Sequence, residues 1–267
     1  MKTIIACTDF SEASANACRY AALIATQLHA KLVMFNILET PLIHSNAGLY
    51  GILSGEQKQA GKQKVAHFMN RLRNQFPDLK IDSFVSNGSF KEELEQFVRN
   101  HHVEAAVMGL AAKDRISKYI YGSHGVDVAG KIDCPVIIVP SGYKDHQLAK
   151  VLLTVDNHEK ILRSSLKDFE TFMERTNARP DLLHVRTENE LFNPRITSLH
   201  INHKELPIHT IQAKDIQSGV RKYSVAQNID LIAVISKKHS VFYDFFTEST
   251  TKKIAYAARV PVMALHV

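Results

Sequence analysis

Residues 103–125, VEAAVMGLAAKDRISKYIYGSHG, are the stretch that decides the fold class of this chain. An apolar run ends at Gly109, a polar and basic loop follows, and Gly122 and Ser123 open a segment that leads to the next apolar run, CPVIIVP. A short continuous apolar run is typical of a strand that is covered on both faces of a sheet. The stretch therefore predicts a strand, a loop and a helix that together form one unit of an α/β sheet.

The rest of the first half repeats this alternation of strand and helix. Short apolar runs predict strands at 3–8, 31–38, 82–86, 104–109 and 135–140. Helical spacing of apolar residues predicts a helix capped by Ser11, and further helices over 56–76, 91–101 and 123–132. This order requires a parallel sheet with right-handed crossovers. A glycine-containing loop at 39–55 could close over a ligand, cover a partner or serve only as a crossover.

The second half reads as a copy of the first. KVLLTVD, from residue 150, parallels KTIIACTD, and further strands are expected at 181–185, 208–212, 230–235 and 260–267, with a helix around 161–173. Pro135 and Pro261 are 126 residues apart, and so are Glu104 and Asp230. We expect two domains, 1–140 and 150–267, joined by a linker at 141–149. The crossing at 187–206 is short and contains a proline, so its helix should be short, bent or absent.

Composition and charge exclude several classes of protein. No apolar run approaches the roughly 18 residues of a membrane helix, and the start of the chain lacks the pattern of a signal peptide. The three cysteines of the chain have no metal-like spacing and indicate reduced thiols in the cytoplasm. The net charge of +6 is spread thinly, without a basic run interleaved with aromatics, which favours a solvated surface over a nucleic-acid interface.

The loop after Gly109 has the properties of an anion site. Ligands of open α/β sheets bind at the carboxyl ends of strands, and Gly109 would let the backbone approach a phosphate closely. Gly122 and Ser123 open the next helix, whose free N–H groups and positive dipole end suit an anion. Lys113 and Arg115 could add charge-assisted contacts. The alternative interpretation is a strand–helix turn in which Ser123 only caps its helix.

These residues resemble a known family. The segment TDFSEAS at 8–14 and the loop pattern G-x2-G-x9-G-[ST] are similar to those of the universal stress protein family, and the whole chain resembles its tandem-domain form. Ala112 stands where the family pattern has a glycine. If that position needs a left-handed backbone, alanine costs roughly 1–2 kcal/mol, and otherwise the change is harmless.

The resemblance implies a fold and a ligand. The fold would be two tandem open, doubly wound parallel-sheet domains of the α/β class, similar to adenine nucleotide alpha hydrolases, the second of them degenerate. Many family members bind ATP, and Asp9 matches the aspartate that contacts adenine. The positions that line the family's adenosine pocket and its phosphate edge correspond here to Cys7, Ile37, Met108 and His124.

The second half lacks the same loop. At the offset of 126 residues, Ile235, Lys238 and Glu248 stand at the three glycine positions of the family pattern, and only Ser249 matches its counterpart, Ser123. A glutamate repels phosphate, and an isoleucine side chain blocks close backbone approach. We therefore expect no cofactor in the C-terminal domain.

Other candidate sites are weaker. His200 and His203, and the adjacent pair His101 and His102, could be metal ligands, but no third ligand is fixed by the sequence, and we assign no metal site. Neither a P-loop nor a nucleophile elbow is present, so no catalytic residue is assigned.

Three functions remain open. The leading one is a cytoplasmic, non-enzymatic stress regulator that binds ATP, with or without Mg²⁺, in its first domain and is read by an unidentified protein partner. The second is an enzyme that uses the same site, either a slow ATPase or a nucleotidyl-transfer catalyst of similar fold, for which Asp114 is the only acid close to the loop. The third is a nucleotide-free scaffold. Family members commonly pair through their last strands, so 135–140 and 260–267 could form that pairing within one chain, and further homodimerisation is open.

Overall fold

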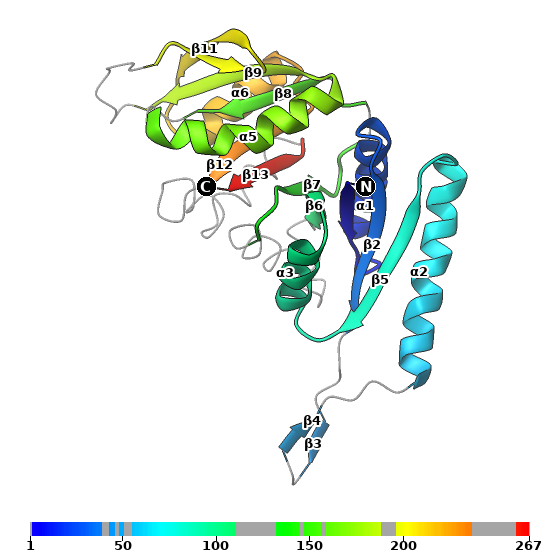
Figure 1. Ribbon diagram of the computed structural model, residues 1–267. Coiled ribbons are helices and arrows are strands. Elements are labelled where there is room, and N and C mark those ends of the chain that lie inside the picture. Colours follow the sequence, from blue (N-terminus) through cyan, green and yellow to red (C-terminus); the bar gives the residue numbers. More distant parts are fainter. Residues whose placement is uncertain are drawn as a thin grey trace.

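One large sheet organises the molecule. The computed structural model describes residues 2–38, 43–45, 48–50, 55–110, 132–144, 147–155, 159–187, 196–236 and 260–266. Its main sheet has eleven strands in the order β10-β11-β9-β8-β12-β13-β7-β6-β1-β2-β5 (Figure 1). All neighbours in this sheet are parallel except the β10–β11 pair and the β13–β7 pair.

The first half confirms the predicted alternation. Its main-sheet strands are β1 (Thr3–Cys7), β2 (Lys31–Leu38), β5 (Ile81–Asn87), β6 (Val103–Leu110) and β7 (Val136–Pro140). Its helices in the described residues are α1 (Glu12–Gln27), α2 (Gly55–Gln75) and α3 (Phe90–Asn100). The strand order β5-β2-β1-β6-β7 is that of an open, doubly wound sheet.

The second half repeats this order. Its strands are β8 (Lys150–Thr154), β9 (Arg179–Arg186), β10 (Ser198–Ile201), β11 (Lys204–Gln212), β12 (Leu231–Ser236) and β13 (Val262–His266). Its helices in the described residues are α5 (Glu159–Thr176) and α6 (Ile216–Ala226). The series β11-β9-β8-β12-β13 corresponds to β5-β2-β1-β6-β7, so the predicted duplication is present in the fold.

The crossing between β9 and β11 differs from that of the first half. In the first half, helix α2 precedes β5. In the second half, the described part of the corresponding crossing contains β10, which pairs antiparallel with β11 through a tight turn. Asn202 and His203 form this turn, and both have positive φ, 49° and 64°. Positive φ at both central residues is the requirement of a type I′ hairpin, which asparagine tolerates well.

The two halves join through their last strands. Strand β13 pairs antiparallel with β7, with Val262 opposite Ile138 and Ala264 opposite Val136. This pairing, expected from the sequence, makes one continuous sheet and covers two edges that would otherwise offer unpaired N–H and C=O groups.

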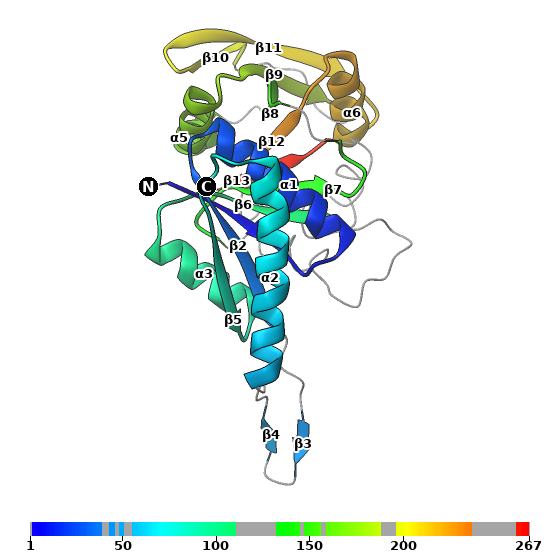
Figure 2. The same cartoon turned by 90° about the vertical axis from the view of Figure 1, so that its right-hand side faces the viewer.

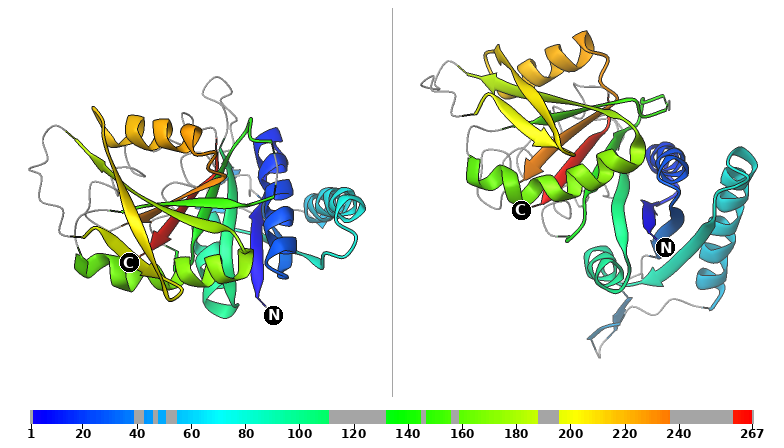
Figure 3. Two further views of the ribbon diagram at one scale, coloured as in Figure 1. Left: turned by 90° about the horizontal axis from the view of Figure 1, so that it is seen from above. Right: turned by 45° about the horizontal axis from the view of Figure 1, so that its top comes forward.

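Helices cover both faces of the sheet (Figure 2). Buried side chains of α1, α2 and α5 form a core on one face, where Tyr20 and Phe169 are fully buried. Leu94 and Phe97 of α3 and Val220 of α6 belong to the core on the other face. The end of α5 lies beside α1 (Figure 3), so the first core is shared by the two halves.

A small hairpin interrupts the segment predicted as a loop at 39–55. Strands β3 (Ile43–Ser45) and β4 (Gly48–Tyr50) pair antiparallel and extend away from the main sheet (Figures 1 and 2). The helix predicted around 56–76 follows as α2.

Candidate functional site

The carboxyl ends of β1 and β6 lie at the point where the strand order reverses. The chain leaves β1 through α1 on one face and reaches the neighbouring β2. It enters β6, the other neighbour of β1, from α3 on the opposite face. Ligands of open α/β sheets bind in the crevice at such a switch point. Asp9 follows β1 directly, and Gly109 lies one residue before the end of β6.

Side chains of the TDFS segment hold the turn between β1 and α1. A carboxylate oxygen of Asp9 accepts a hydrogen bond from the Ser11 N–H at 2.9 Å, and Thr8 Oγ1 accepts one from the Phe10 N–H at 3.1 Å. Ser11 caps α1, as predicted, by accepting from the Ser14 N–H at 3.2 Å. Phe10 has a φ of 63°, which is costly for a bulky residue. The motif therefore fixes both the start of α1 and the Asp9 carboxylate at the switch point.

Three predicted pocket residues lie together on one face of the sheet. Cys7, Ile37 and Met108, on β1, β2 and β6, belong to the same apolar cluster and are 2%, 8% and 1% exposed. Burial raises the pKa of the Cys7 thiol well above its ordinary value, so the thiol stays protonated at neutral pH. The three side chains thus supply apolar surface, and their contact with an adenosine remains a prediction.

Gly109 has a packing role that the sequence did not reveal. A Cβ at this position would overlap the Ala13 carbonyl oxygen and lie 2.8 Å from the Ser14 backbone nitrogen. The first turn of α1 therefore packs directly on β6 because residue 109 has no side chain. At the equivalent place in the second half, Ile235 is a buried member of the core, 8% exposed. The glycine is thus required by helix packing, whereas close approach of a phosphate there remains a prediction.

The remaining predicted residues lie outside the described part of the chain. In the first half these are residues 111–131, which include Asp114 and all of the helix expected at 123–132 except Ile132. The predicted ligand residues among them are Ala112, Lys113, Arg115, Gly122, Ser123 and His124. In the second half they are Asp156, Lys238, Glu248 and Ser249. Strand β6 ends at Leu110, at the switch point, immediately before the first set in the sequence.

Asn36, which the sequence analysis did not single out, lies beside the candidate site. Its side-chain amide, 3% exposed, donates to the Thr8 carbonyl at 2.7 Å and ties the end of β2 to the TDFS turn. Its side-chain oxygen is buried and has no hydrogen-bond partner among the described residues. The available signal was an amide inside the otherwise apolar run KLVMFNIL.

The histidine pairs do not form a metal site within the described residues, which contain no group of three or more metal-ligating side chains. His101 Nδ1 donates to the Phe97 carbonyl at 2.9 Å, and its ring stacks on that of Phe97. His200 lies on β10 and His203 in the hairpin turn. No described helix is long and apolar enough to cross a membrane.

Comparison with known proteins agrees with this architecture. Residues 1–140 match the model of the Universal stress protein family. A universal stress protein from Archaeoglobus fulgidus is similar in structure over 98% of this chain and 97% of its own, with a TM-score of 0.71 and 15% identity. A functionally unknown protein from Pseudomonas aeruginosa is similar over 99% of this chain and 92% of its own, with a TM-score of 0.59 and 10% identity. No curated protein matches the chain. At these identities the structural likeness concerns the fold alone.

Proposed function

We propose that this chain, which belongs to the universal stress protein family, is a regulatory protein that binds ATP or another adenine nucleotide in its first half. The observation that carries the proposal is the position of the TDFS turn. It holds the Asp9 carboxylate at the switch point between β1 and β6, and the sequence predicts that the glycine-containing loop follows β6 there.

Several described residues support the proposal of an adenine nucleoside site. The Asp9 carboxylate is an acceptor and suits an exocyclic amine. Cys7, Ile37 and Met108 form an apolar surface on adjacent strands at the same edge. Asn36, with its buried and unpaired oxygen, adds a polar atom beside Thr8. A site of this kind, mostly apolar with a few placed polar groups, is typical of small-molecule binding.

The phosphates would be held by residues of the loop. In the proposal, backbone N–H groups around Gly122 and Ser123 face the phosphates, with Ser123 and His124 at their edge and Lys113 and Arg115 adding positive charge. Ala112 completes the loop. Mg²⁺, when bound with ATP, would neutralise part of the phosphate charge.

The second half would serve as a built-in pairing partner rather than as a second nucleotide site. We place the domain boundaries at 1–140 and 150–267, with a linker at 141–149. Pairing of β7 with β13 occupies the strand edge through which two separate chains would otherwise associate. A bound nucleotide would then stabilise one conformation of the first half for a protein partner to recognise.

A thermal-shift experiment tests this proposal. ATP in about 100-fold excess over its dissociation constant should raise the Tm by roughly 5–10 °C. Gly122→Val should abolish the shift without lowering the Tm of the ATP-free protein, and Glu248→Gln, at the matching position of the second half, should leave it intact. The absence of any shift at millimolar ATP would contradict the proposal and favour a nucleotide-free scaffold.

A further inference from the structure

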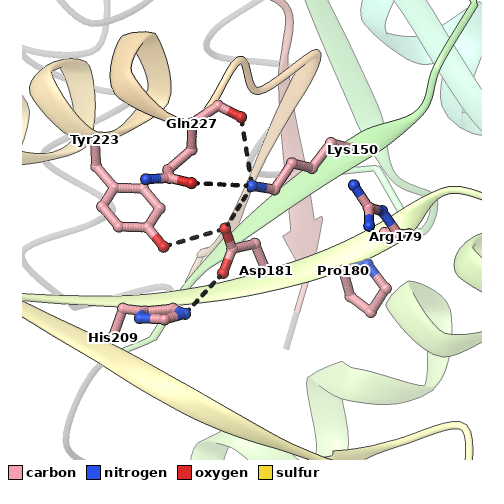
Figure 4. A pocket seen from close by; sticks show the side chains of 7 residues that line it. All are labelled: Lys150, Arg179, Pro180, Asp181, His209, Tyr223 and Gln227. Carbon is pink, nitrogen blue, oxygen red and sulfur yellow. Dashed lines mark hydrogen bonds and ion pairs between the residues drawn. The ribbon is translucent and has the colours of Figure 1, made fainter.

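A cavity lies in the second half, at the amino ends of its strands, whereas the proposed nucleotide site lies at the carboxyl ends of β1 and β6 in the first half. It has a volume of about 350 Å³ and is lined by Lys150, Arg179, Pro180, Asp181, His209, Tyr223 and Gln227 (Figure 4). Lys150 and Arg179 are the first residues of β8 and β9, so the cavity opens at the amino ends of these strands. Tyr223 reaches it from α6 and His209 from β11.

Asp181 is the centre of a polar network in this cavity. One of its oxygens accepts from Tyr223 Oη at 3.1 Å and lies 3.1 Å from Lys150 Nζ, and the other lies 3.4 Å from His209 Nε2. Lys150 Nζ also donates to the backbone and side-chain oxygens of Gln227, at 3.3 and 3.4 Å. The Asp181 side chain is 11% exposed. The charge of Asp181 is therefore balanced by Lys150 inside the network.

The first half has apolar residues at the corresponding positions. Ile5 of β1 lies between Ala106 and Val33, and Leu152 of β8 lies between Ile232 and Asp181. Ala106 and Ile232 are 126 residues apart, so Asp181 occupies the place of Val33.

The same correspondence holds for the two aromatic groups of the cavity. Helices α3 and α6 are offset by the same 126 residues, so Tyr223 takes the place of Phe97. By strand register His209 takes the place of Phe84. In the first half the rings of Phe84 and Phe97 pack at 5.1 Å between centroids. In the first half these three positions are therefore apolar and packed together. In the second half they are occupied by a carboxylate, an imidazole and a phenol.

Arg179 contributes a positive charge to the cavity that no residue of the network balances. Its side chain is exposed at the mouth of the cavity, and within the described residues its guanidinium has no hydrogen bond or ion pair. Figure 4 draws no contact from it to the other six lining residues. A guanidinium offers five N–H donors in a planar fork that matches carboxylate and phosphate geometry.

We propose that this cavity binds a small organic anion whose carboxylate or phosphate group pairs with the Arg179 guanidinium. His209, 53% exposed, and the Gln227 amide would lie beside the anionic group. The Tyr223 ring and Pro180 would contact the rest of the molecule. The Lys150–Asp181 pair fixes the orientation of Tyr223 and His209 and leaves Arg179 to the ligand.

Nuclear magnetic resonance of the full chain tests the proposal at the site itself. The imidazole C–H resonance of His209 is assigned as the signal that disappears in His209→Gln. Inorganic phosphate and acetate are titrated separately at constant pH, with chloride at equal ionic strength as the reference. A saturable shift with phosphate alone would identify a phosphorylated ligand, a saturable shift with acetate alone a carboxylate, and either result supports the proposal. A shift no different from that in chloride overturns it.

Two matched variants then assign the binding to Arg179. Arg179→Gln should raise the dissociation constant of the probe about tenfold or more, since a charge-assisted hydrogen bond is lost. Arg221→Gln removes the same charge from α6 at a residue outside the cavity lining and should leave the constant unchanged. Equal weakening by both variants, or unchanged binding in Arg179→Gln, overturns the proposal.

Discussion

The Arg175 guanidinium of α5, in the second half, lies 2.9 Å from the Glu104 carboxylate of β6, in the first half. The same guanidinium donates to the Leu28 carbonyl at the end of α1. Nearby, the Gln27 side-chain amide donates to the carbonyls of Leu148 and Thr176, at 2.8 and 2.7 Å. Polar contacts therefore join the two halves at the helix ends, in addition to the strand pairing of β7 with β13.

Arg175→Met should weaken this junction. Arg175 is 24% and Glu104 13% exposed at the side chain, and loss of hydrogen bonds to a charged group costs about 1.5–3 kcal/mol. Arg99 pairs with Glu95 on the surface of α3 at 3.5 Å, and Arg99→Met should cost about 0.5 kcal/mol or less. Urea denaturation at equilibrium measures both. An equal loss of unfolding free energy in the two variants would mean that the contacts of Arg175 stabilise the chain no more than a surface ion pair does.

Gly109→Ala should destabilise the first half. The added Cβ would overlap backbone atoms of Ala13, which cannot rotate away, and overpacking of this kind costs about 1–3 kcal/mol. Gly142→Ala is the matched control because nothing lies within 4 Å of its added Cβ. The free energy of unfolding is measured for both variants and compared with that of the native chain. If Gly109→Ala were as stable as Gly142→Ala, α1 would not pack on β6 as closely as described.

Much of the fold was predictable because its signals are local. The run KLVMFNIL predicts β2 over the same residues, 31–38, that form it, since a strand buried on both faces reads as a continuous apolar segment. Ser11 was recognisable as a helix cap from its position before an amphipathic run. The strand β10 was missed, although Asn202 was an available signal for a tight hairpin turn.

The site was less predictable because its contacts are non-local. The need for glycine at residue 109 comes from α1, which contacts β6 from a part of the chain almost a hundred residues earlier. The cavity around Asp181 unites residues from β8, β9, β11 and α6, and no spacing in the sequence marks them as neighbours. Its polar residues became conspicuous only when strand register and the 126-residue offset between α3 and α6 aligned them with Val33, Phe84 and Phe97.

The three cysteines should not react in the native protein. Burial raises the pKa of Cys18 and of Cys134 to about 12 and that of Cys7 well above its ordinary value, so almost no thiolate forms at neutral pH. Iodoacetamide followed by mass spectrometry should find no alkylation of the folded chain and three modifications after denaturation. Rapid native alkylation of Cys7 would contradict the burial of its thiol.

Tyr223 should titrate later than an ordinary tyrosine. Desolvation and the neighbouring Asp181 carboxylate raise its pKa from 10.0 to about 12, because both disfavour the phenolate. The folded state thus holds this proton longer than the unfolded state, and its contribution to stability is lost as pH rises from about 10 towards about 12. The difference in phenolate absorbance between the native chain and Tyr223→Phe gives the titration curve. Asp181→Asn should move its midpoint to lower pH, and an ordinary midpoint in the native chain would contradict the network.

The stoichiometry of ATP binding to the intact chain, measured by isothermal titration calorimetry, tests whether the first half alone holds a nucleotide. We predict one ATP per chain, with binding lost in Gly122→Val and retained in Glu248→Gln. Absence of binding would contradict the nucleotide site proposed in the first half. Two ATP molecules per chain would contradict the assignment of the second half as a pairing partner without a nucleotide.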